Sequence, residues 1–545
     1  MVSYSPLEYR DIDVELEPLA DPQTFEHPDS PLPLLDDSIT TTTASSNARN
    51  MEGTPKWMRT AQPWGRTVAQ KIIALLKPRL ALGYIFWVLI VLYVLYCILA
   101  RSPLLASKLP NYSGRYGVGV IDVEVPVQTP RKTSDLVFKD GKPAFELETV
   151  LFSLYYPTTK GVKSARPKHR WIPKPVGLTA EGYARAAHFN NFISRPIFTF
   201  ALWALAGTIT IPAEVDVPLL PLNEETKDKF PVVVLSHGQA SSRTDYTHYC
   251  GELASSGVVV AAIEHRDGSG PGSIVTTANG ERRVMYLNKK ELEGGKGMED
   301  DEFKFEQLAF RQAEIEETIA VLRSLEAGKG VEVYKTNARK EGKDLDQWEN
   351  RLNFSQTVIA GHSLGATGAL QVLRGATSEK NPAVGGIILD PGKSSGRLNA
   401  DIDVPILVVH SDSWSKKVTV FFGRPHFDTV KDIVKDVLKR VGSSWFLTSL
   451  KTSHPSVTDA PLIEPLLLRW TTGAKIDVHD GLREYVRVSV EFLEFLKNGT
   501  RKGVLSEDVT HEEYGKDTMT EEQKRRIPEE TTKFWQIHVA PPRVD

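Results

Sequence analysis

Short apolar runs alternate with helical patterns from about residue 230 onward. The runs at 231–235, 258–263, 386–389 and 404–409 are rich in Val, Ile and Leu, which is typical of strands buried on both faces of a sheet. Residues 300–325 instead carry apolar side chains at helical spacing, which predicts an amphipathic helix packed on the sheet. Its predicted buried face comprises Phe305, Leu308, Ile315, Ile319 and Leu322. Strands that alternate with helices predict an α/β fold with a mostly parallel, doubly wound sheet.

Two further patterns precede this region. Residues 117–123 and 151–157 are predicted to be antiparallel edge strands that open the sheet. Residues 191–220 are apolar and aromatic, but Pro196, Gly207 and Pro212 interrupt them too often for a membrane span. Two interpretations of this stretch stay open: a core helix, or an interfacial lid that contacts lipid.

The longest apolar run covers residues 80–100 and contains no charged residue. About twenty residues at roughly 1.5 Å each cross a hydrocarbon core of about 30 Å, so this run is predicted to be a transmembrane helix. The basic segment 56–79 precedes it, and fewer basic residues follow it. The positive-inside rule then predicts a single-pass type II protein with a signal anchor, a cytoplasmic N-terminus and a luminal or extracellular catalytic domain. Three N-x-S/T sequons follow the span, at Asn111, Asn353 and Asn498.

Composition adds limits to this picture. The chain has 545 residues, a formal net charge of -3 and two cysteines, so neither a nucleic-acid partner nor a disulfide framework nor a Cys-based zinc site is expected. Residues 1–55 are acidic and poor in aromatics, and are predicted to be a disordered cytoplasmic tail. The catalytic domain is predicted to span 112–500, followed by a charged C-terminal extension, 501–545.

The pattern G-x-S-x-G occurs at residues 361–365, between the apolar run 357–360 and an Ala/Leu-rich helical segment. A strand, this motif and a helix, in that order, are what a nucleophile elbow requires. Ser363 is therefore the candidate nucleophile. In such folds one oxyanion amide follows the nucleophile and the other lies in the loop after an earlier strand, which indicates the backbone N–H groups of Leu364 and Gln239.

A serine nucleophile needs a base, and the base needs an acid to orient it. The expected chain order is serine, acid, histidine. Asp390 and Asp412 each follow a predicted strand, and their spacing does not separate them. Of the downstream histidines, His454 lies in a loop after an apolar run, where the base is expected. The others are His410, His426 and His479.

Several of these segments resemble the platelet-activating factor acetylhydrolase family, in its plasma and cytosolic type II forms. They include Ser236-His237-Gly238, the block at 264–267 that reads EHRD, the elbow GHSLGA, and Ser453-His454. The likeness covers about residues 112–500. It implies an α/β-hydrolase fold with Ser363 as nucleophile, His454 as base and Asp390, rather than Asp412, as acid.

The resemblance also implies an activity. The family hydrolyses the short or oxidised sn-2 acyl ester of glycerophospholipids without calcium, so we expect a phospholipid substrate, no metal and no cofactor. A general carboxylesterase or acylglycerol lipase on the same fold is the first alternative. A catalytically dead hydrolase fold that serves as a membrane-tethered binding module is the second.

Overall fold

The computed structural model describes residues 82–99, 106–221 and 228–543. The helix α2 (Leu82–Leu99) belongs to one compact unit, and the described residues from 106 onward belong to another. The predicted tail 1–55 and the basic segment 56–79 lie outside the described residues.

The described part of the run that was predicted to cross a membrane forms the helix α2. Within the described part of the chain, no helix is sufficiently long and apolar to span a bilayer. The predicted transmembrane helix is therefore not confirmed, and its residues 80, 81 and 100 lie outside the described ranges.

Ten strands of the described residues form one sheet, in the order β14-β13-β10-β9-β8-β4-β5-β2-β1-β3. The neighbours from β5 to β13 pair in parallel, whereas β1, β2 and β14 add antiparallel pairs. The strands are β1 (Gly117–Lys132), β2 (Glu146–Thr158), β3 (Glu214–Val215), β4 (Phe230–Ser236), β5 (Val259–Ile263), β8 (Leu352–His362), β9 (Ala383–Leu389), β10 (Ile406–Ser411), β13 (Trp445–Ser449) and β14 (Trp535–Val539). The predicted mostly parallel α/β sheet is confirmed.

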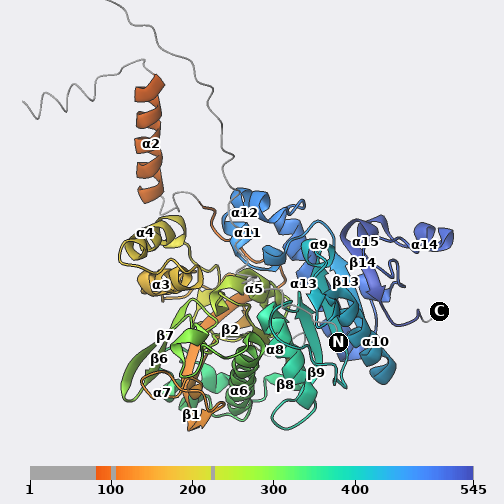
Figure 1. Ribbon diagram of the computed structural model, residues 1–545, viewed down its shortest axis with the longest axis horizontal. Helices are drawn as coiled ribbons and strands as arrows, with labels where there is room; N and C mark the ends of the chain where they lie inside the picture. The colour runs from red at the N-terminus through yellow and green to blue at the C-terminus, as the bar shows by residue number, and fades with distance from the viewer. Residues whose placement is uncertain (1–81, 100–105, 222–227, 544–545) are drawn as a thin grey trace, which may run out of the picture. The chain divides into compact units, whose positions relative to one another are not determined.

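Helices cover both faces of this sheet (Figure 1). Successive strand residues point to opposite faces, so Val233 and Leu235 join a core with α5 (Thr247–Ser255) and α13 (Val478–Asn498). Val232 and Val234 join a second core with helices of the other face. Those helices are α6 (Asp300–Glu326), α8 (Leu364–Val372) and α10 (His426–Val441).

The remaining elements lie outside the central layers. The helices are α3 (Val176–Ala186), α4 (Ser194–Ala206), α7 (Gly330–Thr336), α9 (Asp412–Lys416), α11 (Ala460–Ile463), α12 (Pro465–Thr472), α14 (Glu521–Arg526) and α15 (Glu529–Phe534). Two small hairpins pair β6 (Gly272–Thr277) with β7 (Gly280–Met285) and β11 (Val420–Phe421) with β12 (Arg424–Pro425).

Two expectations need correction. Phe305 does not belong to the buried face of α6, because its side chain is 63% exposed. The first turns of α6 pack Phe303 and Phe310 against Phe145 instead, and a residue two positions after Phe303 is turned about 200° away from it. The core-helix interpretation of residues 191–220 is also wrong for α4, in which Ala206 is the buried residue.

The C-terminal segment contributes to the catalytic domain. The strand β14 pairs with β13 at the edge of the sheet, and Trp535 and Ile537 are fully buried there. The segment 501–545, predicted to be a charged extension, thus supplies the edge strand of the sheet through residues 535–539.

Candidate active site

Ser363 occupies a strained turn between β8 and α8. Its backbone has φ 56° and ψ -124°, a conformation that is costly for a residue with a side chain. A Cβ on Gly361 would lie 2.1 Å from the Gly365 carbonyl oxygen, and one on Gly365 would lie 2.1 Å from the Ser236 oxygen. Both glycines are therefore required for the close packing of this turn, as the motif predicts.

The structure brings Asp390 and His454 together. Asp390 follows β9, and its Oδ2 lies 2.9 Å from Nδ1 of His454. Ser411, at the end of β10, donates its backbone N–H to Oδ1 over 2.6 Å and its hydroxyl to Oδ2 over 2.7 Å. These bonds hold the carboxylate in one orientation. Asp412 does not take this place, since its Oδ1 accepts a hydrogen bond of 2.6 Å from Tyr514.

His454 lies beside the elbow. Its carbonyl oxygen is 3.0 Å from Nε2 of His362, the residue before Ser363, and the centroids of the two rings are 4.4 Å apart. The ring of Trp414 stacks on that of His454, with centroids 4.1 Å apart and an interplanar angle of 18°. Ser413 Oγ accepts the His454 backbone N–H over 3.1 Å. The other downstream histidines are placed elsewhere: His410 and His426 are buried near each other, and His479 is exposed.

His362 is held as a neutral ring. Because Nε2 faces a carbonyl oxygen it must carry the proton, so Nδ1 accepts from the Tyr246 hydroxyl over 2.9 Å. Burial and the neighbouring His454 set the pKa of His362 well below its usual value. Gly238 in turn donates its N–H to the Tyr246 oxygen over 3.1 Å. This chain links the turn at Gly238 to the elbow.

Nitrogen and oxygen atoms of His362, Asp390 and His454 lie within 4.8 Å of one another, a spacing that a metal ion could bridge. The hydrogen bonds of these atoms point to another role. Nδ1 of His454 is bonded to Asp390. In His362, Nδ1 is bonded to the Tyr246 hydroxyl and Nε2 to the His454 carbonyl oxygen. The arrangement fits a histidine oriented by an acid rather than three ligands turned toward one ion.

The predicted oxyanion residues both line the pocket in front of Ser363. Leu364 is the first residue of α8, so its N–H belongs to the helix end that lacks an intrahelical partner. Gln239 follows Gly238, where a Cβ would lie 3.2 Å from the Ser363 Cβ. The backbone of this loop thus packs directly against Ser363, where a loop that stabilises an oxyanion is expected.

Residues 264–267 belong to a hydrogen-bond network that contacts the loop after β4. The Asp267 carboxylate accepts from Arg311 Nε over 2.7 Å, and Nη1 of the same arginine donates to the His237 carbonyl over 2.6 Å. His265 bonds Glu314 over 2.6 Å. All four charged or polar side chains in these two pairs are buried. The motif therefore acts as a buried network that holds the loop carrying Gly238 and Gln239.

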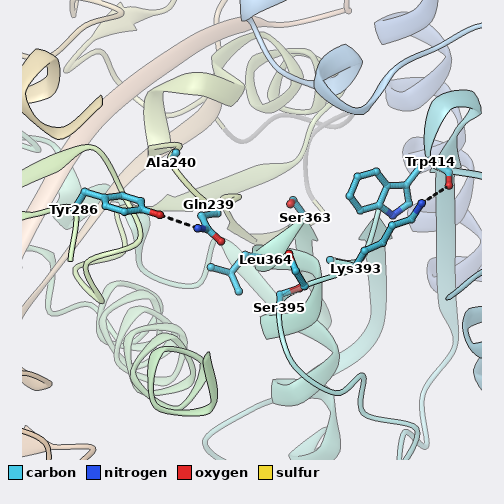
Figure 2. Close-up of a pocket in the computed structure, with 10 residues that line it drawn as sticks. Gln239, Ala240, Tyr286, Ser363, Leu364, Lys393, Ser395 and Trp414 are labelled. Carbon is cyan, nitrogen blue, oxygen red and sulfur yellow. Dashed lines mark hydrogen bonds between the residues drawn. The ribbon is translucent and has the colours of Figure 1, made fainter. Parts of the chain in front are cut away.

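The pocket is small, and its wall combines polar and apolar groups. It encloses about 50 Å³ and is lined by Gln239, Ala240, Tyr286, Ser363, Leu364, Gly392, Lys393, Ser394, Ser395 and Trp414. Figure 2 shows Gln239 bonded to Tyr286 on one side of Ser363, and Lys393 bonded to Trp414 on the other. Lys393 also lies 4.6 Å from the centre of the Trp414 ring.

The sequence alone did not reveal Trp414, Lys393, Tyr246 or Tyr286. Each comes from a different part of the chain and matches no spacing motif. Trp414 follows the end of β10. The carboxyl ends of parallel strands meet at one edge of a sheet, and this rule is the signal that could have pointed to Trp414.

Comparisons with known proteins place most of this chain in one family. The family model described as platelet-activating factor acetylhydrolase, isoform II, matches residues 104–511. The chain is 26% identical over 328 residues to the platelet-activating factor acetylhydrolase of Cavia porcellus, covering 58% of this chain and 64% of the relative. It is 26% identical over 281 residues to the protein of the same name from Bos taurus, covering 51% and 54%. The matched stretches thus span less than two thirds of these curated relatives.

A solved structure was also compared. The ferulic acid esterase from Streptomyces cinnamoneus aligns with a TM-score of 0.48 and 17% sequence identity, over 74% of this chain and 96% of that chain.

Proposed function

This chain belongs to the platelet-activating factor acetylhydrolase isoform II family, and from that membership and the geometry of the site we propose that it is a calcium-independent serine esterase. Its proposed substrates are glycerophospholipids with a short or oxidised sn-2 acyl ester, of the 1-alkyl-2-acetylglycerophosphocholine type. The observation that carries the proposal is the 2.9 Å contact between His454 Nδ1 and Asp390 Oδ2, beside a serine on a strained elbow.

Each group has a role in the proposed reaction. Ser363 Oγ attacks the sn-2 carbonyl carbon while His454 Nε2 takes the hydroxyl proton, and Asp390 stabilises the imidazolium that forms. The backbone N–H groups of Gln239 and Leu364 hold the negative oxygen of the tetrahedral intermediate. His454 then protonates the departing lysophospholipid oxygen, and a water molecule hydrolyses the acyl-enzyme by the same route.

The size of the pocket supports a short acyl group. Its volume of about 50 Å³ has room for only a few water molecules, at roughly 10–15 Å³ for each. The steps above use side chains and backbone amides only, so we expect turnover in the presence of a calcium chelator.

We further propose that α4 contacts the lipid surface. The apolar side chains on and just before this helix are exposed: Phe192 by 92%, Ile193 by 68%, Ile197 by 61%, Phe200 by 67% and Trp203 by 50%. An exposed apolar cluster of this size marks an interaction site. A lipid surface is the occupant that agrees with the proposed substrate. For α4 and the residues just before it, the exposure supports the interfacial interpretation, whereas Ile209, Ile211 and Val215 are buried in the core.

The direct test of the activity is hydrolysis of 1-alkyl-2-acetylglycerophosphocholine in chelator by the full-length protein and by Ser363→Ala. Turnover by the parent alone is the expected result. If neither protein turns over while a fluorophosphonate labels the parent, the chemistry is supported and the substrate is wrong, which favours a carboxylesterase or lipase. Failure of both turnover and labelling would refute the esterase and favour a binding module.

The location of the catalytic domain is a separate proposal, supported by the charges on the two sides of residues 80–100. If the domain is luminal or extracellular, its exposed sequons are open to glycosylation. Asn111 and Asn498 are exposed, whereas Asn353 lies in β8 with its amide bonded to Gln356. We expect a glycosidase to shift the mass by two glycans, and an unchanged mass would refute the luminal location.

A further inference from the structure

The side chain of Gln239 is held from two sides. Its Oε1 accepts a hydrogen bond of 2.9 Å from the ammonium of Lys304, on α6, and its Nε2 donates one of 2.9 Å to the hydroxyl of Tyr286, just after β7. An ammonium can only donate, so the oxygen of the amide must face Lys304. Figure 2 shows the Tyr286 side of this arrangement. Two residues that follow Gln239 by 47 and 65 positions therefore orient its side chain.

We infer that Lys304 is a positioning residue for the esterase reaction. Its ammonium holds the side chain of Gln239, so that the backbone N–H of Gln239 faces the developing oxyanion. This inference rests on the proposed function. Gln239 and Tyr286 line the same pocket as Ser363, so a shift of the Gln239 side chain is transmitted to the backbone that packs against the nucleophile. Oxyanion stabilisation depends on donors that are in place before the reaction starts.

The surroundings of Lys304 make its charge sensitive to pH. Its second hydrogen bond, of 3.1 Å, goes to Gln307 Oε1, so both acceptors are neutral amides. Asp267 and Asp300 favour the charged form, whereas Arg311 disfavours it. Burial, followed by Arg311, lowers the pKa of Lys304 to about 8. The neutral amine would make a weaker hydrogen bond to Gln239 than the ammonium does.

The experiment measures kcat, KM and the pH dependence of kcat for the full-length protein on p-nitrophenyl acetate, a soluble ester. Lys304→Met removes the hydrogen bond and the charge while keeping a long side chain. We expect kcat to fall about 10-fold with KM unchanged, because a misplaced catalytic group is costly even when substrate binding is intact. The parent should lose activity above about pH 8, and this loss should be absent in the variant.

Three comparisons separate positioning from a structural effect. Lys296→Met changes an exposed lysine of the loop before α6 and should match the parent. Gln239→Leu keeps the backbone amide but loses both side-chain bonds, so it should reproduce the loss of Lys304→Met. The double variant Lys304→Met/Gln239→Leu should lose no more than either single variant, since both act through the same contact.

The outcomes distinguish this inference from the proposed function. A Lys304→Met variant with the kcat of the parent, or with the same loss of activity above pH 8, would overturn the inference and leave the esterase in place. A double variant whose loss of kcat equals the product of the two single losses would also overturn the inference. A parent protein that neither hydrolyses the ester nor reacts with a fluorophosphonate would refute the esterase itself, and the positioning role with it.

Discussion

Asp390→Asn tests the site through the tautomer of His454. Oδ1 of Asp390 accepts the backbone N–H of Ser411, which can only donate. An asparagine must therefore keep its oxygen at that position, and its NH₂ group must take the place of Oδ2. That group then faces His454 Nδ1, 2.9 Å away in the parent, and donates to it. The proton of the imidazole is forced onto Nε2, so the ring cannot accept a proton from Ser363.

The expected loss is large because geometry is preserved while the base is disabled. An equivalent change in a serine triad lowers kcat by about 10⁴-fold, which corresponds to about 5.4 kcal/mol of transition-state stabilisation at 1.36 kcal/mol per factor of ten. The structure supports the same magnitude here, since Ser411 can donate its N–H and accept from the new NH₂ group, so the side chain stays in place.

The assay is kcat on a soluble acetyl ester, with the thermal midpoint measured alongside. Asp412→Asn is the matched control, because Asp412 is the other acid that follows a strand and it is bonded to Tyr514 rather than to the histidine. We expect the control to retain the activity of the parent. An Asp390→Asn variant that keeps more than about a tenth of the parental kcat, or a control that loses as much activity as Asp390→Asn, would refute the assignment of the acid.

Three other predictions follow from the same structure. Trp203→Ser should lower activity on phosphatidylcholine vesicles about 5- to 10-fold, because half of this side chain is exposed and its full burial is worth about 2–3 kcal/mol. The activity of Trp203→Ser on a soluble ester should equal that of the parent, and the matched variant Val331→Ser on α7 should keep the parental activity on vesicles. Equal losses on both substrates would contradict the lipid contact. Gly361→Ala should prevent folding or lower the thermal midpoint strongly, because its Cβ would lie 2.1 Å from a backbone oxygen; a variant with the parental midpoint would be inconsistent with the packing described. Burial, followed by the positive charge of Arg311, lowers the pKa of His237 to about 4. The unfolded chain therefore binds more protons between pH 6.5 and 4, and the free energy of unfolding should fall by about 3 kcal/mol on acidification through that range. The urea midpoint of His237→Asn should depend less on pH than that of the parent, and identical pH profiles of the two proteins would argue against this prediction.

The sequence was sufficient for the features that depend on neighbouring residues. The elbow could be located because Gly361 and Gly365 have to flank Ser363 within one turn, and both approach a backbone oxygen too closely for any side chain. The buried strands could be located because both faces of a central parallel strand are apolar. The amphipathic pattern of α6 located the helix but not the residues buried in its first turns, since packing against Phe145 decides that face.

Tertiary structure decided the features that depend on distant residues. Spacing left Asp390 and Asp412 as alternatives, since both follow strands. The contact with His454 separates them because β9 and β10 end side by side and only one carboxylate lies within hydrogen-bond distance of the ring. The exposure of α4 and the place of β14 in the sheet were likewise beyond local patterns.

The site itself shows the same division. The sequence determined that a serine would stand on a strand-to-helix turn, because the glycines that permit this turn are adjacent to it in the chain. It did not determine that Trp414 would stack on His454 or that Lys304 would hold Gln239. These contacts join side chains that are 40 or more positions apart, and only the crossing of strands and helices brings such residues within a few ångströms of each other.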